Sequence, residues 1–181
     1  MVIFMNKFIV LFFIFSLSLF AQNDKTDWLK VHNLTLEGID HLYNMNFDEA
    51  SKKFSELQRI VPNDPRGYFF NAIQYYFLFS IERKKEYYNR FFDLSEKVIK
   101  ICENLIEQNE NDYNSKFYLA GIYVYRGIMY QLDNSIVKAV WDGKKGFSLL
   151  KQIVKEKPDL YDAYLGTGLF DYLLAKIPKT F

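Results

Sequence analysis

Apolar residues recur every three or four positions along most of this chain, which is the spacing of one face of an α-helix. The pattern predicts about seven helices joined by short turns. Their expected ranges are 27–43, 48–60, 65–80, 87–108, 112–131, 135–156 and 159–176. No stretch alternates between apolar and polar residues with hairpin turns at its ends, so no strand is expected. The sixth range carries Gly143 and Gly146, where the helix is expected to kink or break.

Turn and capping residues mark the ends of these helices. Asp27 and Asp112 each precede a helical range and are typical helix-capping residues. The sequence Pro62-Asn63-Asp64-Pro65 ends the second helix and begins the third. A proline is tolerated in the first turn of a helix, because its missing N–H would have no partner there. The pair Pro158-Asp159 marks the expected start of the last helix in the same way.

The predicted helices form pairs that repeat. One set of positions recurs twice at an offset of 48 residues: Ala50, Phe54, Leu57 and Pro62, then Val98, Cys102, Leu105 and Glu110, then Gly146, Leu150, Ile153 and Pro158. A small residue lies at the middle of the first helix of each pair: Gly38, Ala72, Gly121 and Gly168. Helix pairs that recur every 20–50 residues indicate a stacked α-solenoid.

The first pair carries a recognisable framework. A small residue, an alanine, an aromatic residue and a proline follow one another at spacings of 12, 4 and 8 residues: Gly38, Ala50, Phe54 and Pro62. Leu34 supplies the large residue four positions before the glycine. In this the chain resembles the tetratricopeptide-repeat family, in the degenerate form found in exported bacterial proteins. The resemblance covers about residues 27–175 and implies an all-α fold of antiparallel helix pairs stacked as an α-solenoid.

The later units depart from the family pattern. Their spacing is near 48 residues, whereas the family repeats every 34. Residues 159–175 resemble the first helix of a pair with no second helix after it, so the last repeat is expected to be incomplete. A helix pair cannot bury its apolar face alone. A longer natural chain, or a partner that covers the last helix, would supply the missing contact.

The first 21 residues are typical of a secretory signal peptide. Lys7 provides a positive charge, residues 8–20 are the uncharged run FIVLFFIFSLSLF, and Ala21 is a small residue at which cleavage is expected. The run is shorter than a typical membrane-spanning helix. The chain is therefore expected to be exported to the periplasm or envelope, with residues 22–181 forming a helical-repeat domain without a transmembrane segment. The alternative is an uncleaved segment that anchors the chain.

Composition removes several function classes. The 23 Lys and Arg residues nearly balance the 22 Asp and Glu residues, and a net charge of +1 gives no overall electrostatic case for nucleic acid or an anionic membrane. The single cysteine, Cys102, excludes an internal disulfide and is expected to be a buried thiol. His32 and His41 are nine residues apart, which is not the spacing of a helical metal pair. No metal, cofactor or catalytic set is expected.

Tyrosine is abundant, with 14 residues, and many of them lie in the middle of the chain. They predict either core packing between long helices or an aromatic-lined groove. In tetratricopeptide proteins the first helix of each pair lines the concave face. The resemblance therefore implies a set of partner-binding residues: His32, Thr35, Ile39, Arg66, Phe69, Tyr76, Tyr118, Tyr125, Arg126, Leu169 and Tyr172.

The leading hypothesis is a non-catalytic scaffold that binds a protein or peptide partner through this groove. Aromatic and aliphatic side chains occupy the places where some family members grip a carboxylate, so an apolar peptide segment is expected. One alternative is a carrier that holds a lipid or another apolar ligand between the long helices. Another is a structural subunit of an envelope assembly, which would oligomerise through its last helix.

Overall fold

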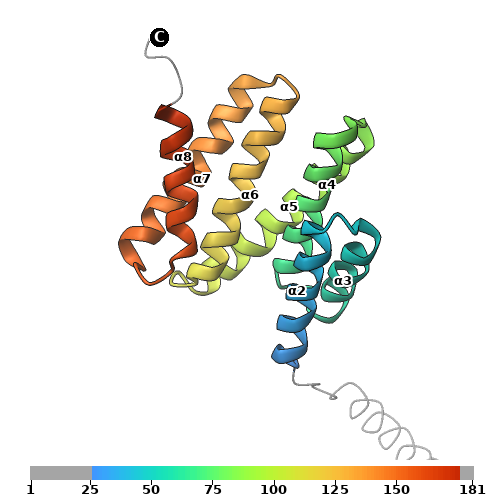
Figure 1. Cartoon of the computed structure of the whole chain (residues 1–181). Coiled ribbons are helices and arrows are strands. Elements are labelled where there is room, and N and C mark those ends of the chain that lie inside the picture. Colours follow the sequence, from blue (N-terminus) through green and yellow to red (C-terminus); the bar gives the residue numbers. More distant parts are fainter. Residues whose placement is uncertain (1–25, 176–181) are drawn as a thin grey trace, which may run out of the picture.

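The computed structural model describes the backbone of residues 26–175 and the side chains of residues 26–168 (Figure 1). These residues form seven helices and no strand: α2 (Trp28–Tyr43), α3 (Phe47–Ile60), α4 (Arg66–Glu82), α5 (Lys85–Gln108), α6 (Tyr113–Leu132), α7 (Ile136–Glu156) and α8 (Asp162–Ala175). The all-α fold class is confirmed for this part of the chain. The predicted signal peptide, residues 1–21, lies outside the described residues.

The predicted caps form as expected. The Asp27 carboxylate accepts hydrogen bonds from the backbone N–H groups of Leu29 and Lys30, both at 3.1 Å. The Asp112 carboxylate accepts one from the backbone N–H of Ser115 at 3.0 Å. These bonds satisfy N–H groups that have no partner within the helix, so each aspartate fixes where its helix begins.

Helices adjacent in sequence pack against each other, and the contact between α6 and α7 is the most extensive. The helices α2, α4 and α6 also touch in succession. Figure 1 shows α6, α7 and α8 side by side, with α5 connecting them to α2, α3 and α4. The residues that exceed the 34-residue repeat lengthen the helices, since α5 has 24 residues and α7 has 21.

One apolar core runs from α2 to α6. Phe54, Leu57, Phe91 and Cys102 are fully buried in it. The predicted burial of Cys102 is thus confirmed, and desolvation raises the pKa of its thiol to about 12. A smaller cluster centred on Ile153 joins α6, α7 and α8.

The predicted break in α7 is wrong, because the helix continues through both glycines. Gly146 packs directly on α6, where an added Cβ would lie 2.7 Å from the carbonyl oxygen of Ala120. The glycine therefore allows close contact between two helices and does not end one of them. No described helix is long and apolar enough to cross a membrane.

Candidate functional site

A cleft of about 680 Å³ lies where the starts of α2, α4 and α6 meet the ends of α3 and α5. Its walls combine apolar, amide and charged side chains: Thr26, Trp28, Ile60, Val61, Pro62, Asn63, Asp64, Pro65, Arg66, Leu105, Asp112, Asn114, Ser115 and Tyr118. Two of the predicted partner-binding residues, Arg66 and Tyr118, belong to this set.

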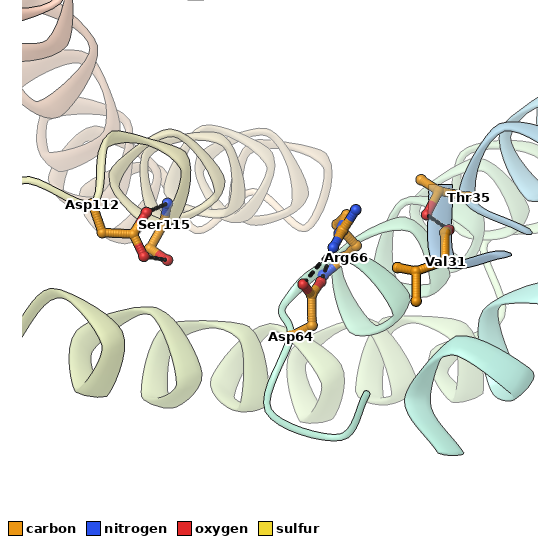
Figure 2. A network of polar contacts seen from close by, with 6 residues as sticks. All are labelled: Val31, Thr35, Asp64, Arg66, Asp112 and Ser115. Carbon is orange, nitrogen blue, oxygen red and sulfur yellow. Dashed lines mark hydrogen bonds and ion pairs between the residues drawn. The ribbon is translucent and has the colours of Figure 1, made fainter. Parts of the chain in front are cut away.

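The turn between α3 and α4 forms one wall and fixes the position of Arg66. The backbone N–H of Asp64 donates to the carbonyl of Val61 at 3.0 Å. The Asp64 carboxylate accepts from the backbone N–H of Arg66 at 3.0 Å and from the guanidinium Nε and Nη2 at 2.8 and 2.7 Å (Figure 2). The hydrogen bonds that the guanidinium donates to Asp64 raise the pKa of Arg66. This bidentate ion pair holds the guanidinium in one orientation and balances its charge.

Two aromatic rings lie next to this ion pair. The guanidinium carbon of Arg66 lies 5.4 Å from the centroid of the Trp28 ring, which is a cation–π distance. Trp28 is 57% exposed, so much of its surface is available to a partner. Tyr118 faces the cleft from α6, and desolvation raises its pKa to about 12 although the charge of Arg66 acts in the opposite direction. Its hydroxyl therefore stays protonated and can donate a hydrogen bond.

The start of α6 forms the opposite wall. Ser115 donates its backbone N–H and its hydroxyl to the Asp112 carboxylate, at 3.0 and 2.7 Å (Figure 2). The adjacent Asn114 is exposed, and its amide forms no hydrogen bond with another described residue. An amide group with free donors and acceptors therefore lines the cleft beside two aspartates that are already engaged.

Tyr118 connects the cleft to an aromatic cluster between α4 and α6. The ring centroid of Phe69 lies 5.2 Å from that of Tyr118 and 6.3 Å from that of Tyr125, both in edge-on geometry. The rings of Tyr76 and Tyr125 are 5.2 Å apart. The structure thus brings together four predicted residues, of which Phe69 is buried and the three tyrosines are half-buried. Edge-on pairs of this kind stabilise the contact between the two helices.

The other predicted residues outside α6 belong to α2 and α8. His32 is exposed and Ile39 is half-buried. Thr35 is buried, and its hydroxyl donates to the carbonyl of Val31 at 2.7 Å (Figure 2). That bond stays within α2, so Thr35 does not present its hydroxyl to a partner. Leu169 and Tyr172 belong to α8, and their side chains lie outside the described residues.

Arg126 faces away from the aromatic cluster, although it follows Tyr125 in sequence. Successive residues of a helix point about 100° apart. Its guanidinium donates to the Asp142 carboxylate at 2.7 Å and to the Ser95 hydroxyl at 3.0 Å, and it also pairs with Glu96. Arg126 therefore connects α5, α6 and α7 through its own side chain.

Sequence reasoning did not select Trp28, Asp64 or Asn114 as site residues. Each lies in a turn or in the first turn of a helix, and the family pattern carries no information for these positions. One signal in the sequence could have placed Asp64 beside Arg66. Asp64 lies two residues before Arg66, a spacing at which a carboxylate can cap the start of a helix. Within the described residues, no group of three His, Cys, Asp or Glu side chains could hold a metal ion.

A second groove, of about 540 Å³, provides a comparison within the molecule. It lies over α3, α4 and α5 and is lined by Gln58, Asn71, Tyr75, Arg90, Asp93, Leu94, Glu96 and Lys97. Four of these eight residues carry charge, and the groove has no counterpart to the exposed Trp28 ring.

Comparison of the chain with family models, curated proteins and solved structures gives no match. The cleft geometry therefore carries the functional argument.

Proposed function

We propose that this chain is an exported, non-catalytic scaffold of the tetratricopeptide type, with a signal peptide over residues 1–21 and a helical-repeat domain over residues 22–181. It holds an extended segment of a protein partner in the cleft at the starts of α2, α4 and α6. The packing order supports the α-solenoid part of the proposal. Sequential helices pack in turn, and the first helices of the first three pairs, α2, α4 and α6, touch in succession, as stacked repeats do.

The observation that carries the proposal is the meeting of Trp28, Arg66 and Tyr118 in one cleft. Tryptophan, tyrosine and arginine are enriched among the residues that dominate interface energetics. Tryptophan and tyrosine bury a large area with little loss of side-chain freedom, whereas an arginine loses more freedom unless it is already held in place. Here the Asp64 carboxylate already fixes the arginine. Less conformational entropy is then lost when a partner binds.

The charge arrangement favours a neutral polypeptide segment over a small anion. Arg66 is paired with Asp64, and the nearby Asp112 adds a further negative charge. The amides of Asn63 and Asn114 line the same cleft. Each amide can donate to a carbonyl and accept from an N–H, so each can pair with the backbone of an extended segment.

The same walls disfavour an apolar lipid. A hydrocarbon chain in the cleft would desolvate Asp64, Arg66 and Asp112 without replacing their hydrogen bonds to water. The aliphatic side chains of Ile60 and Leu105 offer room for one apolar side chain of a peptide between these polar groups. A peptide with a single aromatic or aliphatic anchor side chain suits a cleft that is lined by both apolar and polar groups.

The test is selection of peptides from a displayed random library on the chain recovered from an exporting host. Binding of each selected peptide is then measured by fluorescence anisotropy. Trp28→Ala should weaken binding at least about tenfold, as expected for an interface hot spot. Trp141→Ala is the matched control, since Trp141 is 65% exposed on α7 and is not one of the residues that line the cleft. Equal affinities of the two variants would count against the proposal.

A further inference from the structure

The first turns of α7 carry an exposed apolar patch. Its residues are Ile136, Val137, Val140 and Trp141, with exposed fractions of 57, 72, 63 and 65%. Spacings of three and four residues place Val137, Val140 and Trp141 on neighbouring positions of one helix face. The opposite face, which includes Gly146 and Ile153, is buried. Contiguous exposed apolar surface of this kind marks an interaction site.

The exposed charges within the patch and after it on α7 have one sign. Between residues 136 and 151 the exposed charged side chains are Lys138, Lys144, Lys145 and Lys151. None of them forms an ion pair with a carboxylate among the described residues. The one carboxylate in this stretch, Asp142, is buried and bound to Arg126. The near-neutral total charge of the chain conceals this local excess of positive charge.

We propose that this face of α7 docks on the surface of a membrane that contains anionic lipid. Val137, Val140 and Trp141 would enter the interfacial layer, and the lysines would contact lipid phosphates. An apolar helix face with tryptophan and flanking lysines is the pattern of helices that lie in a membrane interface.

The charges favour a lipid surface over a second copy of the chain. A two-fold dimer would place the same patch of each copy against the other. The four lysines of one copy would then lie near those of its partner, and residues 136–151 carry no exposed carboxylate to offset the repulsion. A membrane surface with negative headgroups complements both the apolar and the charged part of the face.

Trp141 gives a local readout of this docking. The chain has two tryptophans, so Trp28→Phe leaves Trp141 as the only one. This variant, recovered from an exporting host, is titrated with vesicles of equal parts phosphatidylglycerol and phosphatidylcholine, and with vesicles of phosphatidylcholine alone. We expect the anionic vesicles to shift Trp141 emission to the blue and to protect it from iodide quenching, and salt to weaken both effects.

Two pairs of variants test the residues in the same background. Lys144→Gln and Lys145→Gln should each weaken binding about fivefold, which is the expected contribution of one lysine near an anionic surface. Val137→Ser should weaken binding several-fold. Leu29→Ser on α2 should not, although Leu29 is equally exposed at 70%.

Three outcomes would overturn the proposal. The first is no change of Trp141 emission or iodide quenching with anionic vesicles, even where the chain binds them through another segment. The second is equal binding to both kinds of vesicle, with no effect of the lysine variants. The third is a blue shift that grows with protein concentration in the absence of lipid, which would assign the face to self-association.

Discussion

Two glycines of α7 give a matched pair of substitutions with opposite expected effects. At Gly146 an added Cβ would lie 2.7 Å from the Ala120 carbonyl oxygen and 2.9 Å from the backbone nitrogen of Val124. Both atoms belong to the backbone of α6 and cannot rotate away. At Gly143 an added Cβ would meet no atom within 4 Å. The two positions share one helix, so their intrinsic gain from Gly→Ala is the same.

The expected change in the free energy of unfolding combines the gain in helix propensity with the steric cost of the added Cβ. Replacing glycine by alanine inside a helix stabilises it by about 1 kcal/mol. Forcing one extra carbon into a packed contact costs about 1–3 kcal/mol. Gly143→Ala should therefore raise the free energy of unfolding by up to about 1 kcal/mol. Gly146→Ala should lower it by up to about 2 kcal/mol, because the steric term exceeds the helix term.

Urea unfolding followed by far-ultraviolet circular dichroism measures both values, and a thermal scan gives an independent check. For a chain of this size, 1 kcal/mol corresponds to a shift in Tm of about 2–4 °C. The difference between the variants isolates the steric term, since the helix term cancels. A Gly146→Ala protein as stable as the Gly143→Ala protein would refute the close packing of α6 on α7.

Three further predictions concern the core. Arg126→Met should destabilise the fold by about 3–5 kcal/mol, because it leaves the buried Asp142 carboxylate unpaired; adding Asp142→Leu should recover much of this loss in urea unfolding. Gly38→Ala should lower the unfolding midpoint, since its Cβ would lie 2.5 Å from the Phe54 ring, and Phe54→Leu should reduce the difference between glycine and alanine at that position. The Cys102 thiol has a pKa raised from 9.0 to about 12, so it stabilises the fold fully below 9.0 and loses this contribution as the pH rises toward 12. The unfolding midpoint should fall less over that range in Cys102→Ala than in the unmodified chain, and an equal fall in both would contradict this assignment.

Much of the fold could be predicted from the sequence, because two kinds of signal agreed. Apolar periodicity located the helices, and Asp27, Pro65 and Asp112 marked where three of them begin. The last helix begins at Asp162, three residues after the start that Pro158-Asp159 predicted. The predicted break in α7 failed because glycine has two uses in a helix. It can end the helix, or it can admit a neighbouring backbone, and only the packing of Gly146 on α6 distinguishes them.

The candidate site could be predicted only in part. The family pattern selected Arg66 and Tyr118, which line the cleft, because position in the repeat determines the face of a helix. It also selected Phe69 and Tyr125, whose rings pack beside the cleft. It also selected Arg126, whose orientation depends on acidic partners on other helices. Trp28 was absent from the prediction, since its place in the cleft depends on contacts between segments distant in sequence. The exposed patch on α7 was equally hidden, because an exposed apolar stripe and a buried one have the same periodicity.

Photo-crosslinking tests most directly whether a peptide binds in the cleft, because it locates the bound peptide on the chain. A library-selected peptide that carries a benzophenone group is irradiated with the protein, and mass spectrometry maps the covalent adduct. We expect adducts at the start of α2, the turn between α3 and α4, and the start of α6. Adducts at Arg90 and Lys97 in the second groove, or spread evenly over the surface, would contradict it.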